Sequence, residues 1–222
     1  MGELRVHSIP LGAFQTNCHI LEDVERREAI VVDPGDEAEE LLASIKRLGV
    51  RVVAIWNTHA HLDHIGANAA LQKATGAPLS IHRLSAPALE SAVLSGAKLF
   101  GFPFTPSKAD VLWNGGEELH ALGRTWLVRH NPGHSVGCCS IICEAENLMI
   151  GGDLLFQGAI GRTDLPGGSP EVMTASLRAL FNDWGRNQWT VLTGHGDNTT
   201  VGEERTGNFL VRLALTEGLV ET

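Results

Sequence analysis

The sequence predicts a mixed α/β fold in which two sheets pack face to face and helices cover their outer sides. Two blocks of strand-like and then helix-like segments span roughly residues 1–108 and 109–222. The predicted strands are short and apolar, and a sandwich of two sheets with outer helices buries such strands well. No linker separates the blocks and no internal repeat is visible, so we predict a single domain over residues 1–222.

Turn residues and glycines mark the ends of the elements in the first block. Pro34-Gly35 is a strong turn signal after an apolar strand. Gly49 and Gly76 each end an amphipathic helical pattern. We expect an irregular loop with three phenylalanines at Ala97–Pro106. The predicted strands are Leu4–Ile9, Asn17–Leu21, Ala29–Val32, Arg51–Asn57 and Pro78–His82, and the predicted helices are Ala38–Leu48, Ala67–Thr75 and Ala86–Leu94.

The second block changes to strands and turns from Asp110 to Phe156 and then ends in helices. Short β-branched and apolar runs bounded by glycine and asparagine favour strands here. The predicted strands are Glu118–Leu122, Thr125–His130, Cys138–Cys143, Leu148–Ile150 and Thr190–Leu192, and the predicted helices are Pro170–Phe181 and Glu203–Thr216.

Composition and charge narrow the possible partners. Hydrophobic residues make up 43% of the chain, and the formal net charge is −9. An acidic chain is a poor match for nucleic acid or an anionic membrane, which attract clustered lysine and arginine. We find neither a signal peptide nor an apolar run long enough to span a bilayer, so we expect a cytoplasmic protein. The sequence does not indicate its oligomeric state.

The four cysteines lack metal-binding spacing. Cys18, Cys138, Cys139 and Cys143 contain no C-x-x-C pair. In a reducing cytosol we interpret them as small buried hydrophobic residues.

The run from Thr58 to His64 (Thr-His-Ala-His-Leu-Asp-His) is the densest chemical signal in the chain. Neither a buried core nor a solvated loop requires three histidines in seven residues. Imidazole nitrogen and carboxylate oxygen are ligands for a borderline divalent cation such as zinc. One ion cannot easily bind all of His59, His61, Asp63 and His64, so this spacing suggests two neighbouring metals.

Three further candidate ligands lie in glycine-rich turns that follow predicted strands. They are His134 in Pro-Gly-His-Ser, Asp153 in Gly-Gly-Asp, and His195 in Gly-His-Gly. Any one of these residues alone would more often be structural, but three of them beside the first cluster favour a metal site. We assign structural roles to the remaining histidines, His7, His19, His82, His120 and His130.

These motifs, in this order, resemble those of the metallo-β-lactamase-fold hydrolases, and within them the glyoxalase II-like branch. The resemblance spans nearly the whole chain and includes the strand-turn segment Val31–Gly35. It implies a four-layer αββα sandwich with metals at one edge between the sheets. It also implies two divalent metal ions, zinc in the first place, with iron or manganese as alternatives. By position, His59, His61 and His134 hold one ion, Asp63, His64 and His195 hold the other, and Asp153 bridges both.

The implied activity is hydrolysis of a small-molecule thioester such as a hydroxyacyl-thiol. A hydroxide shared by the two cations would attack the carbonyl carbon, with Asp63 and Asp153 as the catalytic carboxylates. A thiolate leaves readily, so no strong general acid is needed. In this family a carboxylate at the position of Asp33 orients a metal ligand without binding the metal itself. A turn-forming aspartate before Pro-Gly is an equal alternative for Asp33.

Differences between this sequence and the motifs of the family indicate which branch of the family it resembles. The segment Gly161–Asp164 (Gly-Arg-Thr-Asp) resembles that of short bacterial glyoxalase II-like proteins, and we expect no additional glutathione-binding helical domain. The chain contains no tyrosine, so a tyrosine that binds glutathione is ruled out. The alternatives are a persulfide dioxygenase with one iron, which shares this segment, and a non-enzymatic or RNA-processing relative. We expect Arg162 to pair with Asp164, and we leave open whether Phe100–Phe104 lines a substrate mouth or caps the core.

Overall fold

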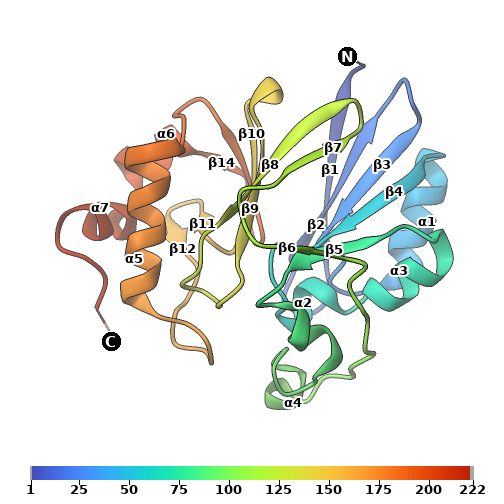
Figure 1. The fold of residues 1–222 in the computed structure, drawn as a ribbon, viewed down its shortest axis with the longest axis horizontal. Helices are drawn as coiled ribbons and strands as arrows, with labels where there is room; N and C mark the ends of the chain where they lie inside the picture. The colour runs from blue at the N-terminus through green and yellow to red at the C-terminus, as the bar shows by residue number, and fades with distance from the viewer. Residues whose placement is uncertain (1, 221–222) are drawn as a thin grey trace.

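Two six-stranded sheets stack face to face and carry helices on their outer sides (Figure 1). The computed structural model describes residues 2–220. The first sheet has the order β1-β2-β3-β4-β5-β6, and the second has the order β14-β13-β10-β9-β8-β7. A small hairpin of β11 (Leu155–Phe156) and β12 (Ala159–Ile160) lies apart from both. The predicted four-layer αββα architecture is confirmed.

The first sheet combines an antiparallel half with a parallel half. Its strands are β1 (Leu4–Leu11), β2 (Thr16–Asp23), β3 (Glu28–Val32), β4 (Arg51–Trp56), β5 (Leu79–His82) and β6 (Val111–Trp113). The strands from β3 to β6 run parallel to one another, so their carboxyl ends meet at one edge of the sheet. Residues of β3 contact the core on both faces, which explains its continuous apolar sequence.

The second sheet directs three of its strands toward the same edge of the sandwich. Its strands are β7 (Glu118–Ala121), β8 (Arg124–His130), β9 (Cys139–Cys143), β10 (Leu148–Gly152), β13 (Thr190–Thr193) and β14 (Thr199–Thr200). Strand β9 is antiparallel to both β8 and β10, and β13 is parallel to β10. Strands β8, β10 and β13 therefore run in the same direction.

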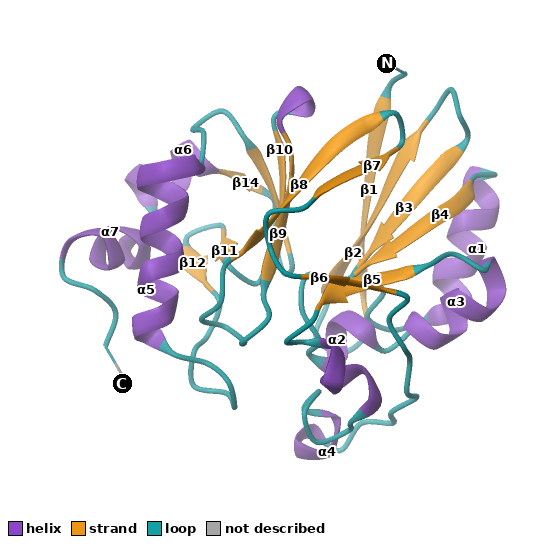
Figure 2. Ribbon diagram, in the orientation of Figure 1, coloured by secondary structure: helices purple, strands orange, loops and turns teal. Residues whose placement is uncertain are grey.

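Three apolar cores hold the layers together. One core joins the first sheet to α1 (Ala38–Leu48) and α3 (Asn68–Thr75). The central core lies between the sheets and includes Trp56, whose ring packs edge-on against Trp113 and Trp126. The third joins the second sheet to α5 (Pro170–Arg178) and α7 (Phe209–Thr216). Figure 2 shows the helices confined to the two outer sides, apart from the short ones near the sheet edge.

Most predicted elements are confirmed to within one or two residues, and the differences have local causes. The predicted helix Ala86–Leu94 is wrong, because a 3₁₀ helix covers only Ala86–Glu90 and Ser91 is extended. The loop predicted at Ala97–Pro106 contains a one-turn helix, α4 (Ala97–Phe100). Helix Pro170–Phe181 is observed as α5 followed by a π-helical stretch, Ala179–Trp184. A short helix, α2 (Leu62–Ile65), within the histidine cluster was not anticipated.

Two further corrections concern the chain's division and its last helix. The predicted boundary between the two blocks, at residues 108 and 109, is wrong for β6. This strand follows the boundary but pairs with β5 in the first sheet and does not join the second. The single helix predicted at Glu203–Thr216 is observed as α6 (Val201–Gly207) and α7 (Phe209–Thr216). Asn208 separates them with an extended backbone, and its side chain accepts hydrogen bonds from the backbone nitrogens of Leu210 and Val211.

The helices of residues 2–220 are all too short or too polar to cross a bilayer.

Candidate metal centre

All seven predicted metal ligands lie at one edge of the sandwich, in segments that follow the carboxyl ends of strands. The loop after β4 carries His59 and His61, and α2 carries Asp63 and His64. The segments after β8, β10 and β13 supply the other three, His134, Asp153 and His195. Each sheet therefore provides part of the site, because parallel-running strands end together.

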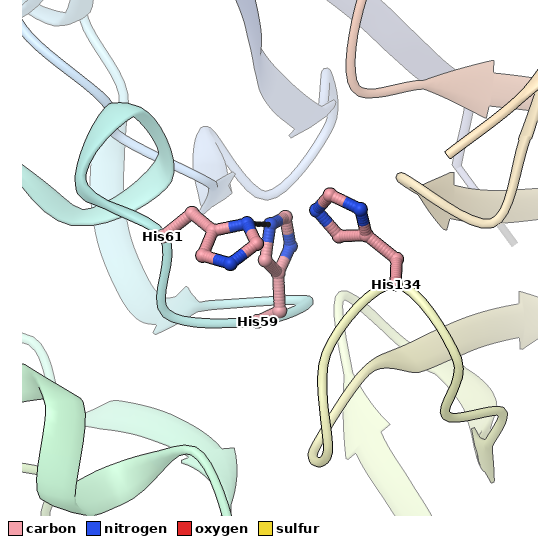
Figure 3. A group of neighbouring side chains, drawn as sticks. All are labelled: His59, His61 and His134. Atoms are coloured by element: carbon pink, nitrogen blue, oxygen red, sulfur yellow. Dashed lines mark hydrogen bonds between the residues drawn. The ribbon is translucent and has the colours of Figure 1, made fainter. Parts of the chain in front are cut away.

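The ligand atoms of these residues form three overlapping groups. They are His59, His61 and His134; His59, His64 and Asp153; and Asp63, His64 and His195. Within each group one ligand atom per residue lies within 4.8 Å of the others. Figure 3 shows the rings of His59, His61 and His134 converging from two separate loops. The structure thus brings together every residue that the sequence singled out, although their role as ligands stays a prediction.

Asp33 fixes the orientation of two imidazoles from behind the cluster. Its carboxylate accepts hydrogen bonds from the Thr58 backbone nitrogen at 2.8 Å and from the Thr58 hydroxyl at 2.7 Å. The same carboxylate lies 3.0 Å from Nδ1 of His64, which must donate because a carboxylate only accepts. Because the Thr58 hydroxyl donates to Asp33, its lone pair can accept from Nδ1 of His59 at 3.1 Å. In both rings Nδ1 is thereby used, and Nε2 is the atom directed into the cluster, where that of His59 lies 3.2 Å from Nδ1 of His61.

Backbone carbonyls orient His134 and His195 in the same way. Nδ1 of His134 donates to the Arg162 carbonyl at 2.7 Å, and Nδ1 of His195 donates to the Phe14 carbonyl at 3.1 Å. A carbonyl can only accept, so Nδ1 of each ring carries a proton and Nε2 is the atom left to bind a metal. These Nε2 atoms lie 3.3 to 3.5 Å from the carboxylates of Asp63 or Asp153. Partners behind a ligand that fix its tautomer are typical of protein metal sites.

The electrostatics of the cluster favour a bound cation. Burial is the largest effect on His59 and His61 and lowers both pKa values, that of His61 to about 4, so both rings are neutral at neutral pH. Burial also lowers the pKa of His64, but nearby carboxylates, led by Asp153 and Asp63, outweigh it and raise the pKa well above its usual value. The negative potential that stabilises this imidazolium also stabilises a metal ion in its place.

Burial acts to raise the pKa of Asp153, yet neighbouring histidines, led by His64, hold it well below its usual value. His195 shows the converse effect. Burial lowers its pKa, but hydrogen bonds to Asp153 and Asp63 outweigh burial and raise it to about 9. Carboxylates that stay ionised beside several imidazoles are suited to metal coordination.

Buried polar atoms without hydrogen-bond partners provide a test of whether the residues fit metal ions. Eight side-chain atoms of the described residues are buried without a hydrogen-bond partner, and three of them are Nε2 of His64, Nε2 of His134 and Oδ1 of Asp153. Leaving such atoms unpaired costs about 1–3 kcal/mol each. All three belong to the cluster and are aimed into it. A divalent cation would supply the missing partner, so this donor set fits a metal centre.

Two glycines allow the chain to approach the carboxylates closely. A Cβ atom on Gly194 would lie 2.0 Å from Oδ1 of Asp153, and one on Gly161 would lie 1.9 Å from its backbone oxygen. Real Cβ atoms do not come this near, so both positions require glycine. The glycine-rich turns seen in the sequence therefore reflect the tight packing of the loops around Asp153.

An open cavity of about 500 Å³ lies over the cluster. His61, Asp63, His134, Asp153 and His195 contribute to its floor. A volume in this range accommodates a small molecule. The cluster is therefore accessible to a substrate and is not a sealed structural site.

Residues that sequence reasoning missed hold the ligands in place. The Thr16 hydroxyl donates to Asp63 at 2.7 Å, and the Asn17 amide donates to the carbonyls of Thr193 and Gly196 on either side of His195. Neither residue belongs to a motif, because these contacts join segments 47 to 179 positions apart. No local signal could have identified them.

The other predictions for individual residues concern Arg162, the cysteines and the remaining histidines. Arg162 pairs with Asp164 through two contacts of 2.6 Å, as expected. The four cysteines are buried, also as expected. Within the described residues, the five remaining histidines belong to none of the three groups. They have other partners: His7 contacts Glu22 at 2.7 Å, and His82 stacks on His130.

Comparison with known sequences identifies a family and several relatives. The model of the Metallo-beta-lactamase superfamily matches residues 11–195. The hydroxyacylglutathione hydrolase GloC of Haemophilus influenzae is 34% identical over 210 residues, which cover 92% of this chain and 97% of that protein. The probable metallo-hydrolase YqgX of Bacillus subtilis is 35% identical over 201 residues, with coverage of 90% and 94%.

Solved structures show the same architecture. The BLEG-1 B3 metallo-beta-lactamase superposes with a TM-score of 0.87 at 36% identity, covering 93% of this chain and 99% of that one. The protein TTHA1623, solved in a di-iron-bound form, gives a TM-score of 0.82 at 36% identity, with coverage of 91% and 98%. Both superpositions cover at least 91% of this chain.

Proposed function

Because this chain belongs to the metallo-beta-lactamase superfamily, whose fold implies a site for two metals, we propose that it is a thioester hydrolase of the glyoxalase II type. The observation that carries the proposal is the cluster of five histidines and two aspartates at the floor of an open cavity. Relatives named as metallo-hydrolases support a metal-dependent hydrolase, and GloC, named a hydroxyacylglutathione hydrolase, supports a thioester substrate. The substrate is a small molecule.

The cluster divides between two metal positions. His59, His61 and His134 would hold one divalent ion, and Asp63, His64 and His195 would hold the other, with Asp153 between them. Zinc is the metal we propose, because imidazole and carboxylate ligands suit it and the chemistry needs no redox change. When bound, such ions supply Lewis acidity that lowers the pKa of water and polarises a carbonyl group.

The residues of the chain position the reactants around these ions. Asp33 and the two backbone carbonyls hold four imidazoles with Nε2 directed into the site, so little reorganisation is needed during the reaction. Thr16 fixes one carboxylate oxygen of Asp63. The buried position of Asp153 excludes water from one side of the site. A thiolate leaves without protonation, so the mechanism requires no strong general acid.

The test is a panel of substrates assayed with purified protein of known metal content. We expect zinc-loaded enzyme to release thiol from acyl thioesters, with little hydrolysis of a chromogenic β-lactam. Asp153→Ala should abolish thioester turnover. His120→Ala, which changes an exposed histidine on β7, should leave it unchanged.

One specific result would replace the hydrolase proposal with the dioxygenase alternative. That result is a single bound iron together with rapid oxygen uptake on glutathione persulfide and no thioester turnover. Cellular activity retained by Asp153→Ala would instead favour a non-enzymatic role.

A further inference from the structure

We propose that the cavity over the cluster binds an aliphatic arm of the substrate and that Lys98, which lines the same cavity, receives a single anionic group. This inference rests on the proposed thioester hydrolase function and names its substrate class. The substrate would be an acyl thioester with an extended apolar chain, not a small polar hydroxyacyl group. The occupant must be the substrate, because the cavity floor consists of the candidate metal ligands.

The wall formed by residues 93–100 is unusually apolar for a surface segment. Val93, Leu94, Leu99 and Phe100 all line the cavity and are all exposed, with Val93 and Leu99 each at 65%. Exposed apolar residues scattered singly over a surface need no explanation, but several on one rim indicate a binding site. Leu165 and Pro166 line the cavity from the segment after β12. An aliphatic chain bound here would remove these side chains from water.

Phe14 connects this wall directly to the reaction centre. Its ring lies 5.6 Å from that of Phe100 and 5.3 Å from that of Phe102, in edge-on and tilted arrangements. Its backbone carbonyl accepts the hydrogen bond from Nδ1 of His195. Phe14 also lines the cavity. The apolar surface therefore begins beside a candidate ligand, where the reacting carbonyl group would lie, and continues outward to Leu99.

The charges around the cavity fit a substrate with one negative group. Two cationic side chains line it, Lys98 and Arg162. Arg162 is already paired with Asp164 through two contacts. Lys98 forms no ion pair with any residue that the structure describes. A single unpaired cation on an apolar wall is complementary to an acyl thioester that carries one carboxylate.

The first experiment uses metal-loaded full-length enzyme and thioesters of 3-mercaptopropionate, with acyl groups from acetyl to octanoyl. We expect kcat/KM to rise about threefold for each methylene that the wall covers. Leu99→Ser should flatten this dependence. Leu112→Ser provides a matched control, because Leu112 is 52% exposed on β6 and lies outside the cavity. A flat dependence in the unmodified enzyme, or a preference for lactoyl over octanoyl esters, would overturn the inference.

The second comparison isolates the role of Lys98. Lys98→Gln should raise KM about twofold to fivefold for esters of anionic 3-mercaptopropionate, as expected for a solvent-exposed ion pair. It should leave kcat unchanged, and it should not affect esters of neutral N-acetylcysteamine. Equal effects on both thiols, or none on either, would contradict the assignment of Lys98.

Binding without turnover separates this inference from the proposed function. Calorimetry compares 3-(octylthio)propanoic acid with 3-(ethylthio)propanoic acid, two thioethers that cannot be hydrolysed. Tighter binding of the octyl compound, lost in Leu99→Ser, would support the apolar site even if no thioester were hydrolysed. Thioester hydrolysis with equal binding of both thioethers would support the function and overturn the inference.

Discussion

At the level of single residues, Asp33 has the widest influence on the site. It bonds directly to His64 and, through the Thr58 hydroxyl, to His59. These two histidines belong to different proposed metal positions, so one buried carboxylate sets the tautomer of a ligand for each ion. Its backbone φ of 51° is unusual for a residue other than glycine and places the carboxylate beneath the cluster. Of the two alternatives posed for Asp33, these contacts favour orientation of the histidines, because its carboxylate bonds to Thr58 and His64, which lie 25 and 31 positions away.

Replacing Asp33 with asparagine should weaken metal binding at both positions. Asp33 accepts three hydrogen bonds through two oxygens, and the amide replaces one of these oxygens by an NH₂ group, so at least one of the three donors meets another donor. We expect metal affinity to fall about 10-fold to 100-fold, measured by competition with a chelator. Asp36→Asn is the matched control, because Asp36 lies three residues away and is exposed. Equal affinities for Asp33→Asn and the unmodified protein would exclude the orienting role.

Metal binding should release protons, and the direction follows from the raised pKa values of His64 and His195. Both imidazoles are protonated near neutral pH in the metal-free protein, and each must lose its proton to coordinate a cation. A histidine whose pKa is higher in the folded than in the unfolded protein stabilises the metal-free fold, and this stabilisation is complete at pH values below its unfolded pKa. For His195 the stabilisation is lost as the pH rises through its folded pKa of about 9. Proton competition therefore weakens, and apparent metal affinity increases, from about pH 7 to about pH 9.

Calorimetry in buffers with different ionisation enthalpies measures the protons released when zinc is added. We expect net release at about pH 7 and a smaller release at about pH 9. His120→Ala should release the same number as the unmodified protein. Zinc binding with no proton release at the lower pH would contradict the assignment of His64 and His195 as ligands.

At the level of elements, sequence periodicity predicted most helices and strands. Where the observed elements differ from the predicted ones, side-chain contacts contribute to the difference. Helix α1 was predicted with its observed bounds, because Gly49 ends a regular amphipathic pattern. The break at Asn208 was not predicted, although Gly207 and Asn208 are residue types that commonly end or begin a helix. The Asn208 side chain accepts from two backbone nitrogens of α7 and donates to the Ala159 carbonyl and to Glu204. The contact with Ala159 is tertiary, and sequence periodicity carries no information about it.

Asn208→Ala should lower the free energy of unfolding by about 2–3 kcal/mol. The substitution removes the N-cap of α7 and leaves buried partners unsatisfied. Thr200→Ala, which removes the cap of α6 at a less buried position, should cost only about 1 kcal/mol. Urea unfolding of the three proteins measures the difference. Equal losses for the two variants would show that the tertiary contact of Asn208 adds no stability.

At the level of the whole molecule, the sandwich assembles the site from both halves of the chain. Strands β3 and β4 of the first sheet end beside strands β8, β10 and β13 of the second. An isolated bridge between Thr16 and His195 joins the two sheets next to the cluster. The seven candidate ligands could be identified from sequence because each stands in a short motif with unusual chemistry. Thr16, Asn17 and the Phe14 carbonyl could not, because only the fold brings them to the ligands.

The most direct test of the central claim is a metal titration of the metal-free enzyme, followed by thioester hydrolysis. A site with two metals predicts that turnover rises with added zinc and reaches a plateau at about two equivalents per chain. Asp153→Ala should give no turnover at any zinc concentration. Maximal activity with one equivalent of iron and oxygen uptake on a persulfide, without thioester hydrolysis, would contradict the account.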